Sequence, residues 1–227
     1  MTLLGAGGAG VAPVFTPLDI SNLQAWYKAD AGITLNGSNV SQWDDQSGNA
    51  RHMIQATASN QPTFTALAKN GLPGLTFDGT NDFLALAADY DMLGASTYFV
   101  VWKATDEGEN SVLSGVSGNY TYLQYGATWY IGSISANIAM TSGLWYLRAA
   151  TADATNNLSE RFSNSVSQGT TGANVSYRKI RYIGQYNSEA NRYLYGVVSE
   201  ILIYNKKLTS PEITDVNNYL NSKYAIY

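Results

Sequence analysis

The sequence has no cysteine, few charged residues and no long apolar run. Without cysteine the fold has no disulfide bond, and a thiol nucleophile or a thiolate metal site is excluded. Charged residues make up 13% of the 227 residues and the formal net charge is -4, so no basic surface is available for nucleic acid or an anionic membrane. No run of about 18 apolar residues exists, which excludes a membrane-spanning helix. The first basic residue is Lys28, so we expect no Sec signal with a charged start and synthesis in the cytoplasm.

Histidine is equally scarce, because His52 is the only one in the chain. A Ser-His-Asp triad or a histidine metal pair would have to include this residue, and no G-x-S-x-G sequence accompanies it. His52 precedes Met53 and Ile54 in a short apolar run that is typical of a strand. We therefore predict no catalytic residue.

The first 17 residues are mostly Gly, Ala, Val and Leu, with prolines at positions 13 and 17. This composition does not support a helix or a core, so we predict an extended arm over 1–17 and one folded domain over 18–227. Gly5, Gly7 and Gly10 match the G-x-G-x-x-G dinucleotide pattern, but the flanking strand and helix that it requires are missing. Either the arm is a flexible tail or its apolar side chains order on a partner. The side chains predicted to dock are those of Leu3, Leu4, Val11, Val14 and Phe15.

From Leu23 onward, short runs of apolar, β-branched and aromatic residues are separated by clusters of Gly, Asn and Asp. This pattern predicts about a dozen strands joined by turns, one of which is the DGTND segment with Asp78 and Asp82. Many short strands without intervening helices favour two packed antiparallel sheets with jelly-roll connections. We therefore predict an all-β sandwich in a single domain.

The clearest strand covers 197–204, where both faces are apolar, so it should be central in its sheet. Simple alternation gives one face Val197, Ile201 and Ile203, and the other Val198, Leu202 and Tyr204. Glu200 shares the second face and must be paired, hydrogen-bonded or neutralised there.

A helix should follow over 210–224 and cover part of the sheet. Thr209 is a suitable N-cap, Glu212 follows three residues later, and Pro211 falls in the first turn. The helix is amphipathic, with one apolar stripe made of Ile213, Val216, Leu220 and Tyr224.

Five segments occur in a familiar order: LQAWYKAD at 23–30, WDDQSGN at 43–49, GLPGLTFDGTNDFL at 71–84, YIG at 182–184 and G-x-x-x-E-I-x-I-Y-N-x-x-L-x-x-x-E at 196–212. Together they resemble the concanavalin A-like, laminin-G-like jelly-roll domains of bacterial surface proteins and of structural proteins of tailed phages. The resemblance covers nearly the whole chain and implies the fold. It does not imply one activity, because this fold hosts lectins, glycanases, adhesins and structural modules.

The resemblance also raises the question of calcium, which many such domains hold at the sandwich rim with a D-x-S-G-N turn. Asp45, Ser47 and Asn49 match that turn and would offer the oxygen ligands that Ca²⁺ prefers. The alternative is an Asx turn without metal, in which Gly48 has a positive φ. Apart from calcium, we expect no cofactor.

Glucanases of this fold carry an E-x-D-x-x-E arrangement, which is absent here. Retaining hydrolysis needs two carboxyl groups about 5 Å apart, and this spacing along one strand supplies them. We therefore predict a structural partner for Glu200, with calcium as the second interpretation.

Aromatic residues are abundant, with 17 tyrosines and five tryptophans that could stack on sugar rings. Core packing and an ordinary hydrated loop are the alternatives. The glycan-binding candidates lie in two segments and are Tyr186, Asn187, Asn191, Arg192 and Tyr193, together with Tyr120, Tyr122 and Trp129.

These features predict a non-enzymatic protein on the surface of a phage particle, made in the host cytoplasm. Its arm would dock on capsid, tail or a sister subunit, and its loops would bind a host polysaccharide. We expect a homo-oligomer. The alternatives are a decoration protein without glycan binding and a glycoside hydrolase of the same fold.

Overall fold

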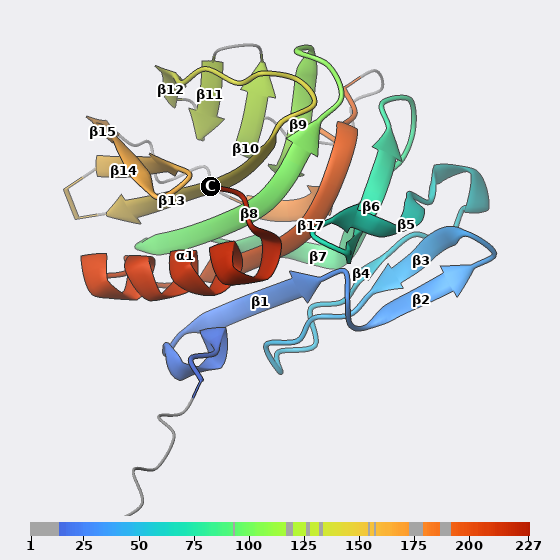
Figure 1. The fold of residues 1–227 in the computed structure, drawn as a ribbon, viewed down its shortest axis with the longest axis horizontal. Coiled ribbons are helices and arrows are strands. Elements are labelled where there is room, and N and C mark those ends of the chain that lie inside the picture. Colours follow the sequence, from blue (N-terminus) through green and yellow to red (C-terminus); the bar gives the residue numbers. More distant parts are fainter. Residues whose placement is uncertain are drawn as a thin grey trace, which may run out of the picture.

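The computed structural model describes residues 14–92, 94–116, 120–125, 128–131, 134–153, 155–156, 158–172, 179–186 and 192–227. In this part of the chain the strands form two antiparallel layers, and the one α-helix lies near the C-terminus (Figure 1). The predicted all-β sandwich with a C-terminal helix is therefore confirmed.

Sheet I is the layer next to the helix. Its first five strands, in spatial order, are β15 (Val166–Gly172), β14 (Leu158–Ser163), β13 (Trp145–Asp153), β8 (Ser96–Ala104) and β17 (Tyr195–Tyr204). On the side of β17 away from β8, two strands pair with different parts of it, β1 (Leu23–Lys28) and β6 (Leu72–Asp78). Strand β5 (Thr63–Lys69) then pairs with β6.

Sheet II packs against the other face of sheet I. Its strands, in spatial order, are β2 (Ile33–Asn36), β3 (Asn39–Trp43), β4 (Met53–Ile54), β7 (Leu84–Asp91), β16 (Lys179–Ile183), β9 (Glu109–Ser114), β10 (Tyr120–Tyr125), β11 (Thr128–Ile131) and β12 (Ile134–Asn137). Two short 3-10 helices, η1 (Pro17–Asp19) and η2 (Ala58–Asn60), complete the elements.

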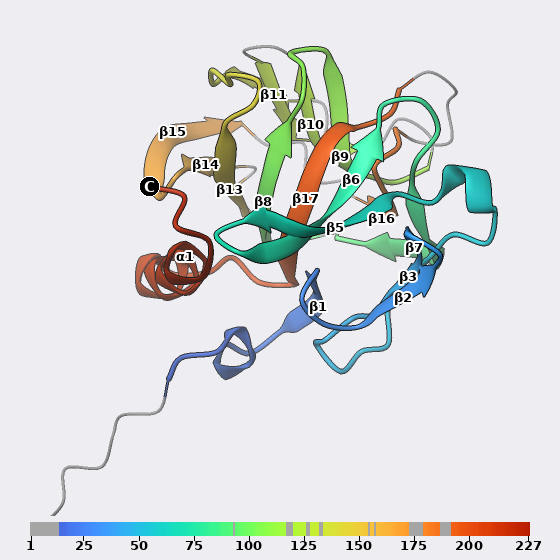
Figure 2. The same ribbon diagram turned by 45° about the vertical axis from the view of Figure 1, so that its right-hand side comes forward.

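Two apolar clusters hold these layers together. The inner core lies between the sheets and includes Trp43, Phe77 and Trp102. The outer core lies between sheet I and helix α1 (Ser210–Tyr224) and includes Phe99 of β8. Both ribbon views show α1 beside the lower ends of β8 and β13 (Figures 1 and 2). Burial of these large side chains on both faces of sheet I is the main stabilising contribution to the fold.

Strand β17 occupies the predicted central position, with β8 on one side and β1 and β6 on the other. The predicted alternation of side chains between the two faces is wrong in the first half of this strand. The register shifts between Val198 and Glu200, so Ser199 forms a bulge and the side chains that follow change faces. Val198 therefore joins Ile201 in the inner core, while Glu200 lies on the face that α1 covers.

Helix α1 begins and packs as predicted. The Glu212 carboxylate accepts a hydrogen bond from the N–H of Thr209 at 2.8 Å, which completes the capping box. The four residues of the apolar stripe are all buried against sheet I: Ile213, Val216, Leu220 and Tyr224. No helix in the described ranges is long and apolar enough to cross a membrane.

The folded part of the chain begins before residue 18. The ring of Phe15 lies 6.4 Å from that of Tyr219 on α1, and the carbonyl of buried Pro17 accepts a hydrogen bond from Tyr204 at 3.1 Å. Val14 is 88% exposed. The predicted docking residues Leu3, Leu4 and Val11 lie outside the described residues.

Candidate functional site

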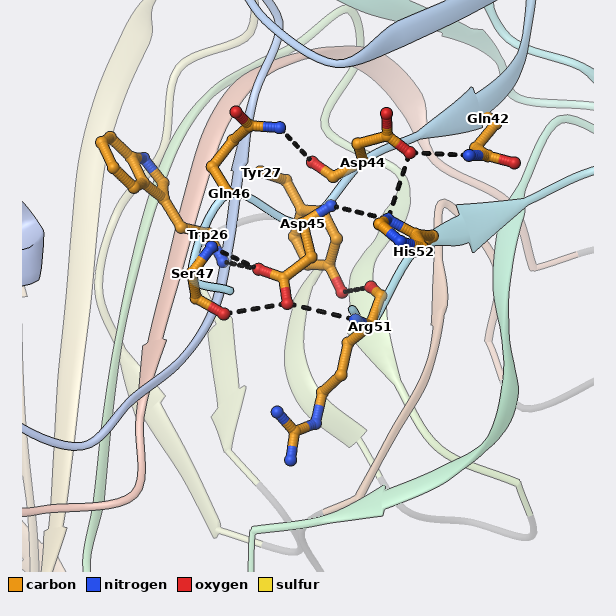
Figure 3. Close-up of polar contacts among 9 residues, drawn as sticks. All are labelled: Trp26, Tyr27, Gln42, Asp44, Asp45, Gln46, Ser47, Arg51 and His52. Carbon is orange, nitrogen blue, oxygen red and sulfur yellow. Dashed lines mark hydrogen bonds and ion pairs between the residues drawn. The ribbon is translucent and has the colours of Figure 1, made fainter. Parts of the chain in front are cut away.

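The D-x-S-G-N turn between β3 and β4 is built around the carboxylate of Asp45, which is 7% exposed. Its Oδ1 accepts hydrogen bonds from the backbone N–H groups of Trp26 and Ser47, both at 2.9 Å. Its Oδ2 accepts one from Ser47 Oγ at 2.8 Å and one from the N–H of Arg51 at 3.1 Å (Figure 3). The carboxylate thus joins the turn to strand β1.

Asn49 strengthens the same connection from the other end of the turn. Its amide Nδ2 donates to the carbonyl of Leu23 at 3.0 Å and to Ser47 Oγ at 2.9 Å. Gly48 has a φ of +88°, a conformation that side chains rarely adopt. The predicted Asx turn is therefore present in full.

This donor set does not fit a calcium ion. Each oxygen of the Asp45 carboxylate already accepts two hydrogen bonds, and Asn49 directs N–H donors into the turn where a metal would need oxygen. Calcium prefers six to eight oxygen ligands, drawn from carboxylates, carbonyls and waters. No group of three or more His, Cys, Asp or Glu side chains suited to a metal occurs in the described ranges. The geometry therefore supports the Asx turn.

The turn positions Arg51 and His52 at the surface. His52 Nδ1 lies 3.1 Å from Asp44 Oδ1 and 3.3 Å from the backbone N of Asp45 (Figure 3). The carbonyl of Arg51 accepts a hydrogen bond from the buried Tyr27 hydroxyl at 2.5 Å. Burial and then the nearby Asp45 charge raise the pKa of this hydroxyl well above 10.0, so it remains a donor.

An open pocket of about 360 Å³ adjoins this turn, between residues 50–52 and residues 86–90. The guanidinium of Arg51 extends away from Asp45 (Figure 3) and lies 4.4 Å from the centre of the Tyr90 ring. Arg51 Nη1 donates to the carbonyl of Gln24 at 2.8 Å, which holds the guanidinium in place. The pocket therefore presents a fixed, stacked pair of a cation and an aromatic ring.

Charges of both signs surround the rim of this pocket. Asp89 lines it and lies 3.9 Å from Lys179 Nζ, which also pairs with Asp91 at 3.1 Å. Partial burial raises the pKa of the Tyr90 hydroxyl above 10.0, although the charge of Arg51 lowers it. Tyr90 is therefore a neutral phenol at pH 7 and can donate a hydrogen bond to a ligand.

The carboxylate of Glu200 has the structural partners that the sequence predicts. It is fully buried, and its Oε1 accepts hydrogen bonds from Trp26 Nε1 at 2.7 Å and from Tyr219 at 3.1 Å. Its Oε2 accepts a hydrogen bond from Tyr224 at 2.8 Å and forms an ion pair with Lys223 at 2.7 Å. This carboxylate fastens α1 to sheet I and is not exposed to a substrate.

The predicted glycan loop is described only at its two ends. Tyr186 is 6% exposed, and the guanidinium of Arg192 lies 4.9 Å from its ring centre. Arg192 also pairs with Glu109 at 3.3 Å, and Tyr193 forms a backbone bridge with Gln185. The burial of Tyr186 does not fit a sugar-stacking role. Asn187 and Asn191 lie outside the described residues.

In the second predicted glycan-binding segment, the structure describes the side chain of only one candidate, Trp129, and this side chain belongs to the core. Trp129 is fully buried, with the guanidinium of Arg148 5.3 Å from its ring centre, so its face is not open to a sugar. Tyr120 and Tyr122 belong to β10, but their side chains are outside the described part of the chain.

Sequence reasoning missed the Arg51 and Tyr90 pair. The two residues are 39 positions apart, and no motif joins them. The signal that could have indicated Arg51 is its place directly after the D-x-S-G-N turn, because loops on a rigid sandwich commonly carry binding residues.

No protein-family model and no curated protein sequence matches this chain. Solved structures do. The binding domain of Paraclostridial Mosquitocidal Protein 1 superposes with a TM-score of 0.64 at 12% identity, over 89% of this chain and 53% of that one. Trypanosoma rangeli sialidase in complex with sialic acid gives 0.63 at 15% identity, over 94% and 35%. Domain 4 of AbnA, an extracellular arabinanase from Geobacillus stearothermophilus, in complex with arabinotriose, gives 0.61 at 15% identity, over 86% and 98%.

These identities show a shared sandwich fold and no more. The chain spans about half of the toxin binding domain structure and about a third of the sialidase, whereas it corresponds to nearly all of the arabinanase domain. The jelly-roll sandwich that the sequence predicts is thus found in proteins of several activities.

Proposed function

We propose that this chain is a non-enzymatic carbohydrate-binding module that holds a glycan in the pocket between residues 50–52 and 86–90. The observation that carries the proposal is the Arg51 guanidinium, fixed 4.4 Å over the Tyr90 ring at an open pocket of about 360 Å³. Sugars combine apolar ring faces with hydroxyl groups, and an aromatic ring with nearby donors and acceptors suits both. Asp89 and His52 add an acceptor and a second polar group on the rim.

Two further observations support this proposal. Domain 4 of the arabinanase AbnA, which has the same fold over nearly its whole length, holds arabinotriose in its structure. Glu200, the carboxylate closest to a catalytic interpretation, is fully buried and accepts hydrogen bonds from Trp26, Tyr219 and Tyr224. We therefore propose both that the chain binds a glycan and that it does not cleave it.

The location on a phage particle rests on the sequence resemblance to laminin-G-like domains and stays a prediction. In that setting the N-terminal arm would attach the module to another virion protein or to a sister subunit. The pocket would then face a host polysaccharide. A decoration protein without glycan binding remains the alternative, and it predicts no ligand for the Arg51 pocket.

A glycan array with two matched variants tests the proposal. Arg51→Ala should reduce binding at least about tenfold, because a stacked, charged donor contributes roughly 1.5 kcal/mol or more. Arg192→Ala is the control, because Arg192 also lies over a tyrosine ring, at 4.9 Å from Tyr186, but in the loop that the sequence favoured. Binding lost in the Arg192 variant and kept in the Arg51 variant would move the site to that loop.

The same glycans address the hydrolase alternative. Incubated with the unmodified protein, any bound glycan should be recovered intact by mass spectrometry. Release of sugar that disappears in Glu200→Gln would overturn the non-enzymatic part of the proposal and leave the binding site in place.

A further inference from the structure

A second cavity, of about 250 Å³, lies between helix α1 and the β14–β15 hairpin, on the outer side of sheet I. Its apolar floor consists of Phe162 and Ile213, which are 9% and 6% exposed and belong to the outer core. Its volume is several times the roughly 30 Å³ that one water molecule occupies in the liquid. The cavity therefore has room for a small organic molecule.

One wall contains a buried polar group that no described residue satisfies. Asn217 is 3% exposed, lines the cavity, and its Oδ1 has no hydrogen-bond partner in the described part of the chain. A buried acceptor without a donor is unfavourable, and most such groups in proteins are paired. A ligand that brings a donor into the cavity would remove this cost.

The opposite wall is negatively charged. Glu160 on β14 is half-buried, and its Oε1 accepts a hydrogen bond from Ser167 at 2.7 Å. Among the described residues that line the cavity, Glu160 is the one charged side chain. A hydrogen bond between the hydroxyls of Ser165 and Tyr227 lies at the rim. The described lining thus offers the Glu160 carboxylate and the Asn217 amide oxygen and includes no cationic side chain, so it favours a positively charged donor.

We propose that this cavity binds the ammonium group of a small alkylamine. The ammonium donates to Glu160 and Asn217, and the alkyl chain lies on Phe162 and Ile213. The site is separate from the Arg51 pocket, which lies beside β7 of sheet II. Neither proposal depends on the other.

Isothermal titration with n-propylammonium chloride and with n-propanol at pH 7 tests the charge requirement on the full chain. The two probes have nearly the same size, so we expect saturable binding of the ammonium and at least tenfold weaker binding of the alcohol. A hydrogen bond to a charged group contributes enough for that ratio. Equal binding of the two probes, or no binding of either, overturns the proposal.

Two variants locate the binding. Glu160→Gln should weaken propylammonium about tenfold or more, whereas Glu107→Gln, the same change on an exposed loop, should leave it unchanged. Asn217→Leu keeps the approximate side-chain volume and should also weaken binding. Equal affinity in the Glu160 and Glu107 variants contradicts the proposal, and this comparison stands even where the Asn217 variant does not fold.

A third probe distinguishes the source of the ammonium. Nα-acetyl-lysine methylamide presents the same group on a peptide unit. Tighter binding than propylammonium assigns the cavity to a lysine side chain of a protein, and weaker binding assigns it to a free amine. Either result must be sensitive to Glu160→Gln, because insensitivity would overturn the assignment to this cavity.

Discussion

Asp82, in the turn between β6 and β7, is a carboxylic acid whose surroundings disfavour its charge. It is 6% exposed, and burial followed by the nearby charge of Asp78 raises its pKa from 3.8 to about 6. Its Oδ2 still accepts the N–H of Asp78 at 3.0 Å, which opposes the rise. The pair thus combines a turn-forming hydrogen bond with a repulsion between like charges.

This shift predicts that Asp82→Asn stabilises the protein at neutral pH. Because the pKa is higher in the folded state, the stability that Asp82 contributes is present below about pH 4 and is lost as the pH rises through about 6. An asparagine stays neutral and keeps an acceptor for the Asp78 N–H. The free energy of unfolding from urea titrations should therefore exceed that of the unmodified protein by about 1–2 kcal/mol at pH 7, and the difference should vanish near pH 4.

Asp215→Asn on the exposed side of α1 is the control for this measurement. It removes the same charge from the surface and should change stability by less than about 0.5 kcal/mol. A gain at pH 7 that persists unchanged at pH 4 would show that Asp82 acts by some means other than its titration.

At the scale of elements, helix α1 is joined to β17 through one buried carboxylate. The bulge at Ser199 places Glu200 on the face that α1 covers, where Lys223 lies between Glu200 at 2.7 Å and Asp30 at 2.9 Å. Burial and the Glu200 charge raise the pKa of the Tyr224 hydroxyl far above 10.0, so it remains a donor to that carboxylate.

Removal of this carboxylate should be costly. Glu200→Ala leaves the buried donors of Trp26 and Tyr224 without their acceptor and removes the buried one of the two carboxylates that pair with Lys223. We therefore expect a loss of about 3–5 kcal/mol in unfolding free energy by chemical denaturation. Glu200→Leu combined with Lys223→Met should lose less than the sum of the single changes, because the lysine and the buried carboxylate that pair with each other are then both removed. A cost for Glu200→Ala near that of the exposed Glu107→Ala would contradict this role.

The sequence predicts the positions of β17 and α1 well, but it predicts less well which side chains of β17 lie on each face of the sheet. Apolar runs and the capping box indicate β17 and α1, because burial and helix capping act over a few neighbouring residues. The bulge at Ser199 depends on how β17 pairs with β8, which no single run of residues encodes. Glu200 could be assigned a partner from its apolar surroundings, but Tyr219 and Lys223 could not be chosen in advance.

The binding residues were harder to predict for a related reason. Aromatic residues are favoured both in sandwich interiors and in sugar sites, so the sequence could not separate buried Tyr186 and Trp129 from Tyr90. Arg51 becomes a candidate only when the turn and β7 lie side by side. Local composition thus predicts turns and cores, whereas the site depends on contacts distant in sequence.

At the scale of the whole molecule, part of the N-terminal segment that the sequence assigned to the arm packs on the sandwich. Phe15 touches Tyr219 of α1, and Pro17 accepts a hydrogen bond from Tyr204, so these residues contribute to the sandwich. Val14 is almost fully exposed and continues into the apolar segment predicted to dock. The packed part of the described chain therefore includes Phe15 and Pro17, which the sequence assigned to the arm.

Two truncations test this division. Deletion of residues 1–13 should leave the melting temperature within about 1 °C, whereas deletion of 1–19 should lower it by roughly 2–8 °C, because it removes the Phe15 and Pro17 contacts, worth about 1–2 kcal/mol. If the arm joins sister subunits, the shorter deletion alone should already reduce the sedimentation coefficient to that of a monomer. Equal melting temperatures for the two truncations would place Phe15 and Pro17 in the arm after all, and an oligomer that survives deletion of 1–13 would assign the subunit contact to the sandwich itself.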